Sequence, residues 1–206
     1  YHGAFAGTAD SVAGDAQALR EALRGLAGAR LEFEDDTGSA PGVALHAALA
    51  RGVASTEAHA VLDWVGAGAH LDVDTSLPLR GDAALAAFRA HQALCDEHGL
   101  DYFAAFQLGP RDLRHRHLLV FARDDAQAGA RVAKLYRALA AAADGRGEGV
   151  LRTHLDFMDD IAAQYAWSDQ AWLRTCESLK DALDPGGLLA PGKSGLWPGR
   201  GGRKRD

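Results

Sequence analysis

The sequence predicts an α+β fold in which an antiparallel or mixed sheet is covered by helices. Two strand-like stretches, 101–108 and 114–121, are separated only by Gly109-Pro110-Arg111-Asp112. A connection this short and turn-like favours an antiparallel hairpin. Helical patterns lie between the strand-like stretches, and the clearest of them spans residues 125–143. Helices layered on a sheet that contains a hairpin are typical of the α+β class, and a parallel doubly wound sheet is the weaker alternative.

The first fifty residues predict two strands, each followed by a helix. Residues 1–8 are apolar and punctuated by glycine, and leucines then recur at helical intervals as far as Gly28. Residues 30–35 alternate between apolar and charged side chains, which is the period of a half-buried strand. A turn-rich stretch follows, and residues 43–50 predict a short helix.

The middle of the chain predicts most of the sheet. Residues 59–65 and 71–77 are expected to form two strands, broken by glycines. Residues 81–98 predict a helix that ends at Gly99, a residue typical of helix C-termini. Its inward side chains are expected to be Leu85, Phe88 and Cys95.

The last third predicts mainly helices. In residues 125–143, four apolar side chains fall at i, i+3, i+4 and i+7, namely Val132, Leu135, Tyr136 and Leu139. A short strand is expected at 150–154, followed by helices at 157–165 and 168–183. The second helix is expected to end at Asp184-Pro185, because proline disfavours a helical residue before it.

Composition limits the classes of partner. The chain has 206 residues, 48% of them hydrophobic, and a formal net charge of −6. This balance argues against nucleic acid, which requires a basic face, and the basic cluster at residues 200–205 is expected to be a solvated end. Cys95 and Cys176 lack a second cysteine at metal or redox spacing, so we expect both to be buried apolar thiols.

The sequence contains neither a membrane-spanning apolar run nor a secretory leader. We therefore expect a soluble, cytoplasmic protein without a membrane partner. The chain opens at Tyr1 and not at methionine, which favours a piece of a longer protein. A periplasmic location stays open if the preceding segment carries a leader.

Residues 187–194 match the phosphate-loop pattern G-x-x-x-x-G-K-[ST] literally. A working phosphate loop needs a buried strand before it and a helix after it, so that backbone N–H groups converge on the phosphates. Here a helix and Asp184-Pro185 come before, and Pro191 removes one donor. We expect a C-terminal loop that folds back over a core, and nucleotide hydrolysis is the rejected alternative.

Two segments carry a family resemblance. Residues 151–159 read Leu-Arg-Thr-His-Leu-Asp-Phe-Met-Asp, and residues 184–198 read Asp-Pro-Gly-Gly-Leu-Leu-Ala-Pro-Gly-Lys-Ser-Gly-Leu-Trp-Pro. They resemble the C-terminal signature of the flavin-linked oxidases grouped with vanillyl-alcohol oxidase, eugenol oxidase and para-cresol methylhydroxylase. The resemblance implies a substrate or cap domain at residues 1–155 and helices and a loop at 156–206 that return to the flavin half. The N-terminal FAD-binding half is absent, so this part alone is expected to be inactive.

The resemblance also implies a set of cofactor-binding residues. The arginine matching Arg152 lies beside the flavin in the family and holds the phenolate oxygen of the substrate, so Arg152 is the expected catalytic residue. The histidine matching His70, after a glycine-rich approach, is the one bonded to FAD in some members. Gly192 and Lys193 are expected to contact the cofactor. The family's tyrosine before the arginine is here Leu151, which cannot donate a hydrogen bond.

The hairpin supplies further pocket candidates. With Leu151, the expected substrate pocket includes Arg114 or His115, in a polar strip that also contains His117 and Arg111. An exposed polar face explains these residues equally well. A metal alternative also exists, because His70, Asp72 and Asp74 would share one face of a strand, but alternating acids more often form a solvated face and no metal is expected.

The family's active-site glutamate falls at Ala58, one position after Glu57, which leaves that role open. The function implied is oxidation of a para-substituted phenol or related aromatic alcohol by hydride transfer to FAD. The expected partners are an aromatic small molecule, the N-terminal FAD-binding domain and further copies in a homo-oligomer. Oxygen and a cytochrome subunit are both open as electron acceptor. The alternative is a non-catalytic ligand-binding α+β domain that keeps the fold without the chemistry.

Overall fold

The computed structural model describes residues 2–34 and 40–199. The chain divides into two compact units, residues 1–61 and 62–206. The functional boundary predicted at residue 155 falls inside the second unit, and it stays a prediction. Within the described residues, no helix is both long enough and apolar enough to cross a membrane.

The described residues of the first unit form two α-helices, most of the 3-10 helix at Glu57–Leu62 and irregular chain. Helix α1 (Ala9–Leu23) begins after Thr8, whose Oγ1 accepts a hydrogen bond from the backbone N–H of Ser11 at 3.3 Å. Helix α2 (Pro41–Ala50) confirms the helix expected at 43–50. The strands predicted at 1–8 and 30–35 are wrong for the described residues, which have no strand there. Glu32 and Glu34 form ion pairs with Arg30 and Arg51 instead of a sheet face.

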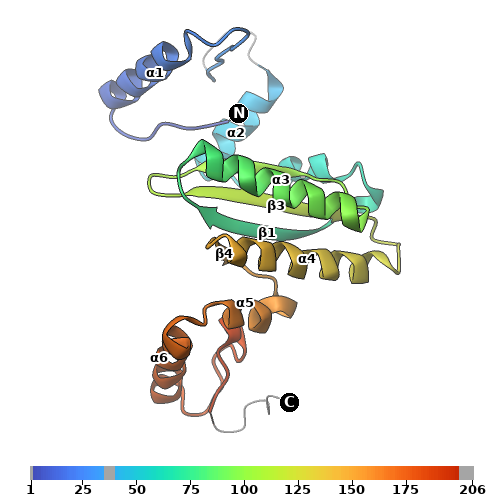
Figure 1. Cartoon of the computed structure of the whole chain (residues 1–206). Helices are drawn as coiled ribbons and strands as arrows, with labels where there is room; N and C mark the ends of the chain where they lie inside the picture. The colour runs from blue at the N-terminus through green and yellow to red at the C-terminus, as the bar shows by residue number, and fades with distance from the viewer. Residues whose placement is uncertain (1, 35–39, 200–206) are drawn as a thin grey trace. The chain divides into compact units, whose positions relative to one another are not determined.

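The second unit contains the sheet. Strands β1 (Ala69–Leu77), β2 (Ala104–Leu108), β3 (Leu113–Phe121) and β4 (Gly149–Arg152) lie in the order β2-β3-β1-β4, and each neighbouring pair is antiparallel. With helices α3 (Gly81–His98) and α4 (Ala128–Gly145), the chain follows the β-α-β-β-α-β order of the ferredoxin-like split unit (Figure 1). The predicted α+β class and hairpin are confirmed, and the parallel alternative is excluded.

Helices α3 and α4 cover one face of the sheet. Helix α3 contacts β3, α4 contacts β1 and β4, and the two helices contact each other (Figure 1). The core between these layers is built mainly from α4 and the central strands, with Val73, Leu119, Val132, Leu135, Tyr136 and Leu139 each at most 2% exposed. The four apolar positions predicted on α4 are therefore confirmed.

Two expectations about the middle of the chain are wrong. Residues 59–65 are not a strand; the 3-10 helix η1 (Glu57–Leu62) occupies most of them, with Leu62 buried and Trp64 beyond it exposed. Leu85 of α3 is 45% exposed and does not face inward. The buried side of α3 passes through Ala87, His91 and Cys95, which are spaced by four residues, so the inward position of Cys95 is confirmed.

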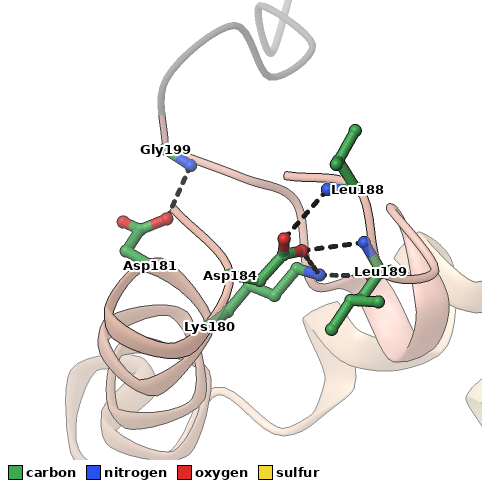
Figure 2. A network of polar contacts seen from close by, with 6 residues as sticks. All are labelled: Lys180, Asp181, Asp184, Leu188, Leu189 and Gly199. Atoms are coloured by element: carbon green, nitrogen blue, oxygen red, sulfur yellow. Dashed lines mark hydrogen bonds and ion pairs between the residues drawn. The ribbon is translucent and has the colours of Figure 1, made fainter. Parts of the chain in front are cut away.

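The C-terminal part consists of η3 (Leu155–Phe157), α5 (Met158–Gln164), α6 (Trp167–Leu183) and η4 (Lys193–Gly195). After α6, the carboxylate of Asp184 accepts the backbone N–H groups of Leu188 and Leu189 at 3.0 and 2.9 Å and pairs with the ammonium of Lys180 (Figure 2). Lys180 also donates to the carbonyl of Leu189. The pairing with Lys180 and these N–H bonds lower the pKa of Asp184 to about 2.

This arrangement explains the phosphate-loop pattern. The loop does hold an anion with its backbone N–H groups, but that anion is the carboxylate of Asp184. Further along, the N–H of Gly192 donates to Leu196 at 2.8 Å and that of Lys193 to Ala190 at 3.1 Å. Helix α6 precedes the loop where a strand would be required. Because these donors have internal acceptors, they are not free to bind phosphate oxygens.

We predict that Gly192→Ala destabilises the C-terminal loop by about 1–3 kcal/mol. Gly192 has φ of 80°, and a Cβ there would lie 2.6 Å from the ring of Trp197, whose indole donates to Asp159 at 2.8 Å. Gly186→Ala is the matched control, because its Cβ would meet Leu188 at an ordinary 3.6 Å. Denaturant unfolding and protease cleavage near residue 190 measure the difference. Equal stability of the two variants would contradict the prediction.

Candidate functional site

One face of the sheet carries the polar side chains that the sequence singled out. The face opposite α3 and α4, called the polar face below, consists of alternate residues on three strands: His70, Asp72, Asp74 and Ser76 on β1, Arg114 and Arg116 on β3, and Arg152 on β4. The two arginines of β3 and Arg152 are exposed. The sheet therefore brings His70, Arg114 and Arg152 to one side.

A β-bulge directs Arg152 to this face. On β4, Val150 is paired with Thr75, but Arg152 is paired with Asp74, so two steps along β4 match one step along β1. Val150 is buried on the helix side, and strict alternation would have turned Arg152 to the helix side as well. The additional residue, Leu151, restores Arg152 to the polar face and is itself 49% exposed. Bulges of this kind commonly re-aim a side chain beside a functional site.

A buried carboxylate lies at the centre of the polar face. Asp74 is 8% exposed, and its Oδ2 lies 3.7 Å from Nε of Arg116. Burial raises the pKa of Asp74, and the nearby guanidinium groups of Arg116, Arg152 and Arg114 oppose that rise, while Asp72 adds to it. The face thus combines several fixed positive charges with one buried carboxylate.

His70 lies near the beginning of β1, at the other end of the polar face from Arg152. Its Nε2 is 3.6 Å from Oδ1 of Asp72, and one third of its side chain is exposed. His70 lies four residues before Asp74 on β1, and Asp74 is the cross-strand partner of Arg152. His70 and Arg152 are therefore about 13 Å apart along the sheet. Gly68, with φ of 68°, precedes the strand, and a Cβ there would lie 2.9 Å from Oδ1 of Asp63. The glycine-rich approach expected before His70 is a tight turn, η2 (Gly66–Gly68).

His115 does not lie on the polar face. It is fully buried on the helix side, where its Nε2 is 2.8 Å from the hydroxyl of Tyr102 and its ring stacks on Phe106. The predicted polar strip joining Arg114, His115 and His117 is therefore wrong. Adjacent residues of a strand point to opposite faces, so Arg114 and His115 cannot line one pocket.

His115 belongs to a group that the sequence analysis missed, the buried histidine cluster of His91, His115 and His117. The Nδ1 atoms of His91 and His117 are 3.1 Å apart, and Nε2 of His117 is 3.5 Å from Sγ of Cys95. All three imidazoles are fully buried. His91 could have been found, because it falls between Ala87 and Cys95 at helical spacing.

Burial keeps this cluster uncharged. Burial lowers the pKa of His91 to about 2, that of His117 to about 3 and that of His115 to about 4, and neighbouring positive charge adds to each effect. Burial also raises the pKa of the Cys95 thiol to about 12. Cys95 is thus the buried, unreactive thiol that was predicted, whereas Cys176 is only half-buried.

The remaining candidates are a metal group, the C-terminal loop and Glu57. His70, Asp72 and Asp74 do share a face, but the described part of the chain contains no group of three His, Cys, Asp or Glu side chains suited to a metal ion. Lys193 is exposed on the loop beside α5, and cofactor contact by Gly192 and Lys193 stays a prediction. Glu57 is exposed on η1.

A cavity of about 500 Å³ lies away from the polar face, between α5, α6 and the C-terminal loop. Its polar lining is acidic, with Asp159, Glu177 and Asp181. Asp159 and Asp181 already accept hydrogen bonds from Trp197 and Gly199. Among the described residues that line this cavity there is neither an imidazole nor a guanidinium, so the polar face is the better candidate for chemistry.

Comparison with known proteins adds independent findings. The family model described as FAD linked oxidases, C-terminal domain, matches residues 4–194. The 4-cresol dehydrogenase [hydroxylating] flavoprotein subunit of Pseudomonas putida is 24% identical over 195 residues, which cover 95% of this chain and 37% of that protein.

Solved structures give the same result for the fold. The isoeugenol complex of 4-ethylphenol oxidase from Gulosibacter chungangensis superposes with a TM-score of 0.85 at 29% identity, over 94% of this chain and 38% of that one. Substrate-bound p-cresol methylhydroxylase gives 0.83 at 23% identity, over 94% and 37%. The chain thus spans less than two fifths of the length of these relatives.

Proposed function

Because the chain belongs to the family of FAD linked oxidases, whose C-terminal domain it matches, we propose that it is the substrate-binding part of a flavoprotein that oxidises para-substituted phenols or related aromatic alcohols. The names of the relatives support this substrate class, since they refer to 4-cresol, 4-ethylphenol and p-cresol. We assign the FAD-binding segment to the part of the relatives' sequences that lies outside the region matched by this chain.

The observation that carries the proposal is the placement of His70 and Arg152 on one face. They lie about 13 Å apart along the sheet, a spacing comparable to the length of a three-ring flavin. An imidazole with an exposed edge suits covalent attachment, and a permanently charged planar guanidinium suits the end of the ring that becomes anionic. The residues present therefore fit FAD, which when bound supplies the hydride acceptor.

The chain's own residues would act on the substrate. Arg152 stabilises the phenolate oxygen, so that electron density assists loss of hydride from the benzylic carbon. The resulting quinone methide takes up water or loses a proton. Leu151 offers an apolar surface in place of a second donor, so the phenolate depends more heavily on Arg152, or its oxygen is held by another group of the polar face such as Arg114.

Partners follow from the same proposal. The chain requires the FAD-binding segment to form a complete site, and we expect a homo-oligomer. One relative is a flavoprotein subunit, which supports a separate electron-accepting subunit such as a cytochrome, with oxygen as the other acceptor. A second candidate function is ligand binding without catalysis. Leu151 favours it, because this exposed apolar side chain supplies no hydrogen-bond donor beside Arg152, where the family has a tyrosine.

We predict that the chain expressed with an FAD-binding segment is yellow and that the colour stays with the polypeptide after acid precipitation. In His70→Ala the flavin is released into the supernatant, because the attachment atom is lost. His59→Ala, which changes an exposed histidine of η1, is the control and keeps the colour in the pellet. Release of flavin from the unmodified protein would contradict covalent attachment but not flavin binding. A folded protein that binds no flavin would favour the non-catalytic alternative.

A further inference from the structure

The polar face contains a row of charges that alternates in sign across three strands. Arg116 on β3 and Arg152 on β4 are the direct cross-strand partners of Asp74 on β1. Side chains directly opposite each other on one face of a sheet interact most strongly. Asp74 therefore lies between two arginines: Nε of Arg116 is 3.7 Å from its Oδ2, and the β4 bulge brings Arg152 into the row opposite it.

Asp74 occupies an unfavourable position for a carboxylate. It is 8% exposed, and its Oδ1 is inaccessible and has no hydrogen-bond partner among the described residues. The charged groups around it are Arg114 and Arg116 on β3, Asp72 on β1 and Arg152 on β4. Burying a carboxylate whose hydrogen bonds are incomplete costs free energy. Such a carboxylate interacts strongly with the guanidinium groups around it, and Arg152 is one of them.

We propose that Asp74 is a positioning residue whose carboxylate holds the guanidinium of Arg152 over the centre of the polar face. The inference rests on the proposed function, in which Arg152 binds the phenolate. An exposed arginine side chain has many rotamers, and a fixed carboxylate on the adjacent strand restricts them. Arg116 lies on the other side of the same carboxylate, with its Nε 3.7 Å from Oδ2 of Asp74.

The positioning is tested first without a cofactor. The Nε–H signal of Arg152 in ¹⁵N NMR spectra of the chain reports whether the guanidinium is ordered. We expect an ordered signal in the unmodified chain, a motionally averaged one in Asp74→Asn, and partial recovery in Asp74→Glu. Ser76→Ala, on the next rung of the same face, is the control and leaves the signal unchanged. An equally ordered Arg152 in Asp74→Asn would overturn the proposal.

A second variant guards against misfolding of Asp74→Asn. Arg116→Gln leaves Asp74 with Arg152 as its cross-strand guanidinium, so the Arg152 signal should stay ordered. Loss of order in Arg116→Gln would overturn the proposal even if Asp74→Asn could not be purified.

The flavin-containing protein separates this inference from the proposed function. There, Asp74→Asn should slow flavin reduction by 4-ethylphenol roughly 10-fold or more with a smaller change in KM, because a displacement of about 1 Å can cost roughly 10²-fold in rate. Unchanged reduction would overturn the positioning role while phenol oxidation stands. If Arg152 loses order in Asp74→Asn but no phenol is oxidised by the unmodified protein, the positioning role stands and the proposed function fails.

Discussion

Replacing Arg152 with alanine is expected to lower the rate of flavin reduction by a phenol roughly 10²–10³-fold, which is the usual effect of removing one donor from a developing negative charge. The effect should fall on the reduction step more than on substrate affinity, because departure of hydride moves negative charge from the phenolate to the flavin, and the guanidinium would lie beside the end of the ring that receives it. Leu151 cannot compensate, since it has no hydrogen-bonding group. Stopped-flow measurement of flavin absorbance under anaerobic conditions gives the rate directly.

Two further variants define what Arg152 contributes. Arg152→Lys keeps the charge but loses the planar pair of donors, so an intermediate rate is expected. Arg174→Ala removes an exposed arginine of α6 that pairs with Asp169, and it should leave the rate unchanged. A rate within a few-fold of the unmodified protein would exclude Arg152 from the chemistry.

The sheet, its hairpin and the two covering helices could be predicted because each has a strong local period. In α4, for example, Val132, Leu135, Tyr136 and Leu139 all repeat at helical spacing and all are buried. The alternation at residues 30–35 was equally regular, but a strand requires a pairing partner. Glu32 and Glu34 form ion pairs with arginines instead, and the alternation of a segment does not determine which other residues it contacts.

The direction of Arg152 could not be predicted from periodicity. Val150 is buried against the helices, and a regular strand would have turned Arg152 the same way. The bulge at Leu151 depends on pairing with β1, which lies more than seventy residues earlier in the chain. The family resemblance identified the residue, whereas only the structure explains how it reaches the polar face.

His115 shows the opposite case, because its burial follows from the period of the strand. Leu113 and Leu119 have the same parity on β3 as His115 and His117, and both leucines are buried. Strand alternation alone therefore predicts that the two histidines face the core. The resemblance to the family's pocket-lining hairpin favoured a polar surface for them instead.

The buried histidine cluster should make the stability of the chain strongly dependent on pH. In the unfolded chain each histidine has a pKa near 6.5, whereas burial lowers the pKa of His91, His117 and His115 to about 2, 3 and 4 in the folded state. Between those values the unfolded state binds more protons than the folded state. The stabilisation that depends on neutral histidines is therefore complete above pH 6.5, and the free energy of unfolding falls as the pH drops below that value.

The expected loss is large relative to the stability of a typical domain. Three such histidines together reduce the free energy of unfolding by about 4 kcal/mol between pH 7.5 and 5.5. Ordinary domains are stable by only about 5–15 kcal/mol, so urea unfolding at a series of pH values should resolve the loss readily. Arg146, whose Nη2 is 3.4 Å from Nε2 of His91, opposes protonation further, although its pairing with Glu148 moderates that charge.

His117→Gln tests the origin of this dependence, since it removes one buried titrating group while keeping a polar side chain of similar reach. Whatever its effect on stability at neutral pH, the slope of unfolding free energy against pH below 6 should fall by about 1.4 kcal/mol per pH unit, the contribution of one proton. His59→Gln changes an exposed histidine and should leave the slope as it was. An unaltered slope in His117→Gln would show that the cluster accepts protons without unfolding, and the physical picture of a permanently neutral core would then be wrong.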